Sequence, residues 1–274
     1  MKDFEDKVVA ITGGATGIGF SFAKQFGKEG AKIVIAARRE ERLQAAVQTL
    51  TEMGIEAKYF ICDVTKRDSV EAFADFAWNA FGKVDVIVNN AGAMLQGIPV
   101  IDLTVEQFQH VYNVNIFGIV NGSAVFGKRF IQQGTPTAIY NVGSENSLFN
   151  GTPMGAAYVS SKHAVLAITE SLKQEVPDFI EVGLICPGFV RSELNDAELM
   201  QLGMDADQYT SIAMEQIKAG EFYIVSHAYN IVRINERHDA IAKAFEQYAP
   251  RYEGDNEFDV WTLYTRLMET SGSE

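Results

Sequence analysis

Tyr158 and Lys162 stand four residues apart in a stretch of helical pattern, so their side chains lie on one face of the predicted helix. With its ordinary pKa of about 10, a tyrosine hydroxyl exchanges protons poorly at neutral pH. A lysine ammonium one turn away favours the phenolate, and we expect it to bring the pKa of Tyr158 down towards neutrality. Because such pairs also occur on solvated helix faces, the chemistry depends on elements that would position a substrate beside them.

A glycine-rich turn joins a predicted buried strand at residues 7–12 to a predicted helix at residues 20–28. This layout directs a helix N-terminus and free backbone N–H groups at a phosphate. Gly13 permits the tight turn, Gly17 lets a pyrophosphate approach the backbone, and Gly19 lets the helix pack close to the strand. Glycine-rich turns also occur where no ligand binds, but the flanking strand and helix favour nucleotide binding.

Two arginines, Arg38 and Arg39, follow the next predicted strand at residues 31–37. In dinucleotide folds an acidic residue here binds ribose hydroxyls, whereas an arginine accommodates a 2′-phosphate. The guanidinium of Arg38 can hold a phosphate through two hydrogen bonds. The sequence therefore favours NADP(H) over NAD(H), although both arginines could simply begin a solvated helix.

Strands and helices alternate along the rest of the chain. The sequence predicts strands at residues 55–62, 84–88, 137–142, 180–185 and 222–225, and helices at residues 40–53, 66–81, 104–133, 156–176 and 233–248. This alternation implies an α/β fold in which helices cover both faces of a parallel sheet. Thr104 and Gln107 have the form of a helix capping box.

Three motifs, Thr12-Gly-x-x-x-Gly17-x-Gly19, Asn89-Asn90-Ala91-Gly92 and Tyr158-x-x-x-Lys162, resemble those of the short-chain dehydrogenase/reductase family, in its NADP-preferring type. The resemblance covers residues 7–192. It implies a Rossmann-like, doubly wound, parallel seven-stranded sheet of strand order 3-2-1-4-5-6-7. The family would make residues 1–274 one NAD(P)-binding domain, with a substrate lid at about 193–220 and a C-terminal extension at about 227–274.

The resemblance also implies the residues that hold the cofactor. They are Gly13, Ala15, Thr16, Gly17, Ile18, Gly19, Arg38, Arg39, Asp63, Val64, Asn90, Ala91, Gly92, Tyr158, Lys162, Pro187, Gly188, Val190 and Ser192. From the residues alone, Asp63 could equally cap the turn that follows its strand.

In this family a serine placed thirteen positions before the tyrosine donates a hydrogen bond to the substrate oxygen. Ser144 lies fourteen positions before Tyr158 and Ser147 lies eleven before it. We prefer Ser144, because Asn141-Val142-Gly143-Ser144 follows the family's pattern at the strand end. The family would also use the backbone carbonyl of Asn115 to hold a water near Lys162, where the asparagine interrupts a helix.

We expect the substrate pocket to be formed by Met94, Glu145, Leu148, Phe149, Met154 and Phe189. This set suggests an apolar or aromatic ketone or secondary alcohol. Glu145 could touch a polar substrate or merely face water. Met200, Leu202, Met204 and Met214 lie in the expected lid, where methionines at such spacing more often pack than recognise a ligand, although an adaptable apolar lid suits a hydrophobic substrate.

The formal net charge of −13 and the pI near 4.8 argue against binding to nucleic acid or an anionic membrane surface. Cys62 and Cys186 each end an apolar run and are expected to be buried thiols in a reducing compartment, without a disulfide framework or zinc-ligand spacing. The N-terminus lacks a signal-peptide core and no apolar run is long enough to span a bilayer. A cytoplasmic protein is expected.

These observations predict an NADP(H)-dependent oxidoreductase that interconverts a ketone and a secondary alcohol. The alternatives are an NAD-dependent secondary-alcohol dehydrogenase and a non-catalytic NADPH-binding sensor or scaffold. The tail after residue 222 resembles bacterial short-chain enzymes that oxidise benzylic alcohols in lignin-derived dimers, the C-alpha-dehydrogenases. A homodimer or homotetramer is expected, the dimer formed through the helices that carry Asn115 and Tyr158.

Overall fold

The computed structural model describes residues 3–193 and 197–271. The chain divides into two compact units, Met1–Ala228 and Tyr229–Glu274. The first unit contains the sheet and every motif that the sequence singled out. The second begins close to residue 227, where the C-terminal extension was expected.

The first unit is built on one parallel sheet of seven strands in the order β3-β2-β1-β4-β5-β6-β7, which confirms the predicted topology. The strands are β1 (Val8–Thr12), β2 (Lys32–Ala37), β3 (Ala57–Ile61), β4 (Val86–Asn89), β5 (Thr137–Val142), β6 (Ile180–Cys186) and β7 (Tyr223–Val225). Strands β1, β4 and β5 are buried along their whole length, as expected for a sheet covered on both faces.

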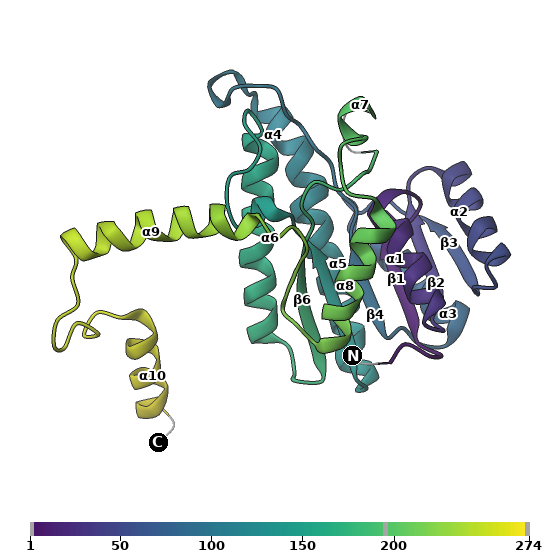
Figure 1. The fold of residues 1–274 in the computed structure, drawn as a ribbon. Coiled ribbons are helices and arrows are strands. Elements are labelled where there is room, and N and C mark those ends of the chain that lie inside the picture. The colour runs from purple at the N-terminus through teal and green to yellow at the C-terminus, as the bar shows by residue number, and fades with distance from the viewer. Residues whose placement is uncertain (1–2, 194–196, 272–274) are drawn as a thin grey trace. The chain divides into compact units, whose positions relative to one another are not determined.

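Helices cover both faces of this sheet (Figure 1). They are α1 (Gly17–Lys28), α2 (Glu40–Glu52), α3 (Arg67–Phe81), α4 (Val105–Tyr112), α5 (Gly118–Gln133), α6 (Ala156–Glu175), α7 (Ala197–Met200) and α8 (Ala206–Ala219). Helices α1, α2 and α8 pack on one face through residues such as Phe22, Leu43 and Tyr209. Helices α3 and α5 pack on the other through Phe73 and Phe126.

The long helical stretch predicted at residues 104–133 is interrupted by a π-helical turn, Asn113–Phe117, between α4 and α5. The predicted capping box is present, since Thr104 accepts from the backbone of Gln107 while the Gln107 side chain accepts from the Thr104 backbone. The wide turn reaches from the N–H of Gly118 to the carbonyl of Asn113. Such turns insert one extra residue and often occur at functional sites.

The strand register brings several polar residues to one edge of the sheet. Thr12 pairs with Ala36 on one side and with Asn89 on the other, and Asn89 pairs with Asn141. Asn89 is therefore the last residue of β4 rather than the first residue after it. In an open parallel sheet, ligands bind in the crevice outside these carboxyl ends.

The second unit consists of helix α9 (Asn230–Tyr248) and helix α10 (Val260–Ser271). Helix α9 begins three residues before the predicted start at residue 233. Helix α10 lies where the sequence analysis expected only an acidic tail. The helix forms because apolar residues stand at helical spacing in this segment. In the described part of the chain, no helix combines the length and the apolarity needed to cross a membrane.

Candidate active site

A cavity of about 450 Å³ opens at the carboxyl ends of the central strands. Every residue that the sequence assigned to the cofactor lines this cavity, together with Ser144. A volume of this size is typical of a small-molecule site. Segments that lie far apart in the sequence, from Gly13 to Ser192, therefore meet in one place.

The glycine-rich turn forms one wall of the cavity. Gly13 and Gly17 adopt left-handed φ values of +65° and +57°, which favour glycine. A Cβ atom on Gly19 would lie 2.4 Å from Nδ2 of Asn90, so close packing excludes any side chain there. A Cβ atom on Gly17 would instead stand in the cavity, 3.4 Å from Cβ of Ser192. The space beside Gly17 and the N-terminus of α1 suits a phosphate group.

Thr12 and Asn90 fix the turn against β4. The Thr12 hydroxyl accepts hydrogen bonds from the backbone N–H groups of Asn90 (3.0 Å) and Ala91 (3.2 Å). The Asn90 amide donates to the carbonyls of Thr12 and Gly13 at 3.0 and 3.1 Å. These four bonds explain why the motifs containing Thr12 and Asn90 occur together.

The far end of the cavity contains Arg38, Arg39 and Asp63. Arg39 donates to the carboxylate of Glu193 at 2.6 Å, and Arg42 lies 3.6 Å from the same carboxylate. Among the described residues Arg38 forms no ion pair within 4 Å. Asp63 accepts from the backbone N–H and the hydroxyl of Thr65 at 3.1 and 2.8 Å. Asp63 thus caps the turn after β3 and also lines the cavity.

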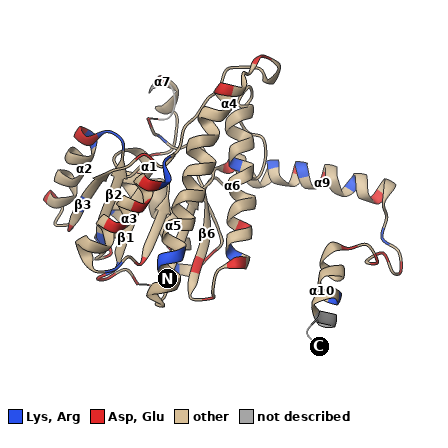
Figure 2. Cartoon of the chain, turned by 180° about the vertical axis from the view of Figure 1, so that it is seen from behind, with Lys and Arg blue, Asp and Glu red and all other residues tan. Residues whose placement is uncertain are grey.

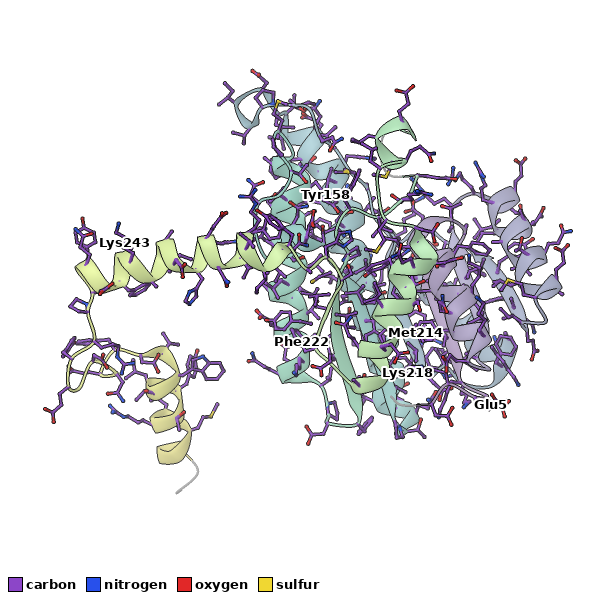
Figure 3. All side chains as sticks on the ribbon, in the orientation of Figure 1. Glu5, Tyr158, Met214, Lys218, Phe222 and Lys243 are labelled. Atoms are coloured by element: carbon purple, nitrogen blue, oxygen red, sulfur yellow. The ribbon has the colours of Figure 1, made fainter. Side chains whose placement is uncertain are left out.

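Tyr158 and Lys162 extend from the first turns of α6, and Tyr158 is labelled in Figure 3. The Lys162 ammonium is buried, donates to the carbonyl of Val142 at 2.9 Å and lies 5.7 Å from the centre of the Tyr158 ring. Ser144 is buried at the end of β5, its hydroxyl donates to the carbonyl of Pro187 at 3.5 Å, and it is close enough to the Tyr158 hydroxyl to lower the pKa of that group by hydrogen bonding. Ser144, Tyr158 and Lys162 are therefore assembled around one point of the cavity.

The pKa of Tyr158 is raised, which is the opposite of the direction expected from Lys162. Burial is the largest cause, the hydrogen bond from Ser144 works in the lowering direction, and the negative charge of Glu145 adds to the increase. Burial also lowers the pKa of Lys162 to about 8, because an ammonium inside the protein loses its hydration. The tyrosine in this structure is therefore a protonated phenol at neutral pH.

The two candidate serines are in different environments. The Ser147 hydroxyl donates to the carbonyl of Lys162 at 2.7 Å and accepts from the N–H of Ser144 at 3.2 Å, and it does not line the cavity. Ser144 does line it. Ser147 therefore braces the strand end against α6, and Ser144 is the serine that a ligand could reach.

Asn115 is fully buried behind the cavity wall and does not line it. Its side-chain oxygen accepts from the N–H of Ala93 at 2.7 Å, while its amide donates to the carbonyl of Ala93 and to the hydroxyl of Ser161, both at 2.9 Å. The π-helical turn thus ties the segment after β4 to α6, one residue before Lys162. The role predicted for the backbone carbonyl of Asn115 stays a prediction.

The substrate side differs in part from the expected set. Met94, Glu145 and Phe189 line the cavity, but Leu148, Phe149 and Met154 do not. Leu148 packs on the apolar cluster of Ile119, Val165, Leu184 and Cys186, Phe149 is buried, and Met154 is 55% exposed. The turn after Glu145 directs these three side chains elsewhere, which spacing in the sequence could not show.

Polar residues that the sequence did not single out take their place in the lining. They are His110, Asn146 and Thr152. His110 on α4 and Val114 in the π-helical turn stand four apart in the sequence, and both line the cavity. That spacing was the available signal for His110, but nothing in the sequence showed which face of the helix meets the cavity.

The segment after β6 closes the remaining side. Val190 forms a parallel bridge with Met204, Arg191 donates its backbone N–H to the carbonyl of Met204 at 2.9 Å, and the Ser192 hydroxyl donates to the sulfur of Met200 at 3.6 Å. Val190, Ser192 and Met200 line the cavity, whereas Leu202 is 79% exposed and Met214 is buried in the core. The predicted lid between 193 and 220 includes residues 194–196, which lie outside the described part of the chain.

Comparison with known proteins agrees with this geometry. A family model described as short chain dehydrogenase matches residues 7–202. The chain is 32% identical over 249 residues to the uncharacterized oxidoreductase YxnA of Bacillus subtilis, covering 88% of this chain and 69% of that protein. It is 33% identical over 202 residues to the C alpha-dehydrogenase of Sphingobium sp. strain SYK-6, covering 73% of this chain and 66% of that protein.

Among solved structures, a short-chain dehydrogenase/reductase from Burkholderia phymatum in complex with NAD is similar. Its TM-score is 0.83 at 28% identity, covering 92% of this chain and 100% of that one. The matched region contains the glycine-rich turn, the Asn-Asn-Ala-Gly segment and the Tyr158–Lys162 pair that line one cavity. The chain belongs to the short-chain dehydrogenase family and is an oxidoreductase of the kind that uses a nicotinamide cofactor.

Proposed function

We propose that this enzyme interconverts a ketone and a secondary alcohol with NADP(H), and that Ser144, Tyr158 and Lys162 carry the proton transfer. The observation that supports this most strongly is the convergence of these three side chains in the cavity that the glycine-rich turn also lines. General acid–base catalysis needs a donor within hydrogen-bond reach of the reacting oxygen.

The residues present fit a dinucleotide. The open space beside Gly17 would hold its phosphates, Asp63 and Val64 would lie at its adenine end, and Val190 and Ser192 would hold its carboxamide. When bound, the nicotinamide ring gives or takes the hydride at the reacting carbon. The protein itself positions the substrate and the cofactor, stabilises the charge that develops on the reacting oxygen, and exchanges a proton with it.

Each catalytic side chain has a separate task in this proposal. Ser144 orients the substrate oxygen by a hydrogen bond. Tyr158, held as a phenol, donates its proton to that oxygen during ketone reduction and takes it back during alcohol oxidation. The ammonium of Lys162 favours the phenolate that forms and would also bind ribose hydroxyls. Asn115 and a water would extend the relay to solvent.

The preference for NADP(H) rests on Arg38. It lines the cavity directly after β2, at the position where an acidic residue would bind ribose hydroxyls, and its neighbour Arg39 is engaged by Glu193. A guanidinium binds a phosphate dianion through charge-assisted hydrogen bonds. A dehydrogenase that prefers NAD(H) is the alternative, and a comparison of the two cofactors separates them.

An apolar or aromatic ketone or secondary alcohol is the substrate class that we propose, because Met94, Phe189 and Met200 line the cavity. The resemblance to a C alpha-dehydrogenase supports an aromatic alcohol. The polar groups of Glu145, Asn146 and Thr152 add hydrogen-bonding capacity on the same side. We further expect a cytoplasmic enzyme that forms a homodimer or homotetramer.

Tyr158→Phe tests the assignment. It removes the hydroxyl but keeps the ring, so cofactor binding measured by fluorescence should stay near that of the unchanged enzyme while turnover falls by about 10²–10⁴-fold, the usual contribution of a general acid. Tyr59→Phe is the control, because that hydroxyl contacts Gln44 and Glu40 outside the cavity. Equal turnover in both variants would overturn the proposal.

The rival reading is a protein that binds NADPH without chemistry. It predicts stoichiometric binding of NADPH together with no turnover by the unchanged chain on any member of a panel of aryl ketones and their alcohols. Absorbance at the NADPH band distinguishes the two readings directly.

A further inference from the structure

The hydroxyl of Ser144 is surrounded by hydrogen-bond partners at the end of β5. It accepts from the backbone N–H of Asn146 at 3.2 Å and from the side-chain Nδ2 of the same residue at 3.4 Å. It donates to the carbonyl of Pro187 at 3.5 Å. Ser144 and Asn146 are only 5% and 3% exposed, so bulk water competes little for these bonds.

The far end of the Asn146 side chain fixes the orientation of its amide. The oxygen Oδ1 accepts from the backbone N–H of Gly151 at 2.8 Å. A backbone N–H can only donate, so the oxygen must face Gly151 and the NH₂ group must face Ser144. Asn146 therefore presents a donor, and not an acceptor, to the serine hydroxyl.

This arrangement decides what the Ser144 hydroxyl can offer to a ligand. A serine hydroxyl has one hydrogen to donate and two lone pairs that accept. Asn146 fills both lone pairs, one through its backbone and one through its side chain. The hydrogen is left for the ligand. The carbonyl of Pro187 competes weakly for it, because that carbonyl also accepts from the N–H of Glu145 at 2.7 Å.

The partners that orient the hydroxyl are neutral groups. Strands β4 and β5 contain no charged residue, and the charged side chains of the first unit lie mainly on its helices and loops (Figure 2). Asn146 supplies two neutral hydrogen bonds to Ser144, and both residues line the cavity. A change of one amide group to an acceptor is therefore enough to alter the direction of the hydroxyl.

We propose that Asn146 is a positioning residue, which holds the Ser144 hydroxyl as a hydrogen-bond donor towards the reacting oxygen of the substrate. A donor that is already oriented stabilises charge on a carbonyl oxygen without turning during the reaction. An alcohol substrate would accept from Ser144 and give its own proton to Tyr158. This inference rests on the proposed function, in which Ser144 contacts the substrate oxygen.

Asn146→Asp separates this role from support of the surrounding loop. One carboxylate oxygen still accepts from the N–H of Gly151, but the other accepts where the amide donated, so Ser144 turns its hydrogen away from the cavity. With the aryl ketone that the unchanged enzyme reduces fastest, kcat should fall by about 10²–10³-fold, as for the loss of one donor. The KM of the ketone and the dissociation constant of NADPH should change little, because the lost interaction strengthens in the transition state.

Asn150→Asp is the matched control for the added charge. Asn150 lies in the same loop, is exposed and does not line the cavity, so kcat should stay unchanged. Asn146→Ala adds no charge and serves as the second variant if thermal unfolding shows that the buried carboxylate destabilises the fold. It should give a smaller loss of kcat, because the hydroxyl is then free to rotate rather than turned away. Unchanged kcat in both Asn146 variants, or a rise in KM alone, would overturn the proposal in favour of a loop support.

A double-mutant cycle with Ser144→Ala shows whether Asn146 acts through the serine. If it does, Asn146→Asp should cost at least about tenfold less in kcat when Ser144 is already alanine, since residues that act through one contact are not additive. Equal costs in both backgrounds, with Ser144→Ala itself impaired, would overturn this inference and leave the proposed function standing. Full turnover in Ser144→Ala would instead refute the proposed role of the serine, and the inference with it.

Discussion

Gly17→Ala separates the cofactor cradle from the fold. Gly17 has a left-handed φ of +57°, and a Cβ atom there would stand in the cavity at ordinary contact distance, 3.4 Å, from Ser192. An alanine would therefore strain the backbone by about 1–2 kcal/mol without colliding with the protein. In a protein of this size the melting temperature should fall by about 2–8 °C.

The same methyl group should weaken cofactor binding much more than it weakens the fold. It occupies the place where a phosphate would approach the backbone, and losing one hydrogen bond to a charged group costs about 1.5–3 kcal/mol. The dissociation constant of NADPH should therefore rise by about 10- to 100-fold. Isothermal titration calorimetry measures this constant and thermal unfolding measures the stability.

Gly54→Ala is the matched control. Gly54 also has a left-handed φ, +79°, but nothing lies within 4 Å of its Cβ position and it is outside the cavity. The backbone strain is then the same while the binding site is untouched. If the two variants bind NADPH with equal dissociation constants, the backbone at Gly17 does not contact the cofactor, which refutes the assignment of the glycine-rich turn to phosphate binding.

Four further variants probe the rest of the site. Arg38→Asp should turn the preference towards NAD(H), and an unchanged ratio of kcat/KM for the two cofactors would contradict the phosphate assignment. Glu145→Gln removes a charge that raises the pKa of Tyr158. Alcohol oxidation needs the phenolate, so its pH profile should shift to lower pH. An unchanged profile would show that Glu145 does not influence the pKa of Tyr158. Ser144→Ala should reduce kcat by about 10²–10³-fold, as for the loss of one donor to a reacting oxygen, and should also lower stability because the N–H of Asn146 loses its acceptor. Ser147→Ala should lower stability, because the carbonyl of Lys162 and the N–H of Ser144 both lose a partner, but should reduce kcat far less; a larger loss of kcat in Ser147→Ala than in Ser144→Ala would exchange the roles of the two serines.

The predictions that agree with the structure depend on local geometry. A strand followed by glycines at fixed spacing has few ways to continue, and the left-handed φ values of Gly13 and Gly17 show why those positions require glycine. Alternating strands and helices with right-handed crossovers leave few sheet topologies. The capping box could be predicted from the sequence because Thr104 and Gln107 lie within one helical turn of each other.

Other features depend on contacts between distant segments. The pKa of Tyr158 is raised by its burial and by the charge of Glu145. The four-residue spacing between Tyr158 and Lys162 in the sequence could not reveal either cause. The side chains of Leu148, Phe149 and Met154 turn away from the cavity while His110 enters its lining. The choice between Ser144 and Ser147 needed the hydrogen bond from Ser147 to the carbonyl of Lys162.

The sequence by itself determined the family and, through that resemblance, the order of the strands, because the three motifs consist of residue types at short and regular spacing. The tertiary structure decided which polar groups share the cavity, how Asn115 ties the segment after β4 to α6, and how buried the tyrosine and the lysine are. Burial and charge act through space across elements that are far apart in the chain, and no pattern within one segment records them.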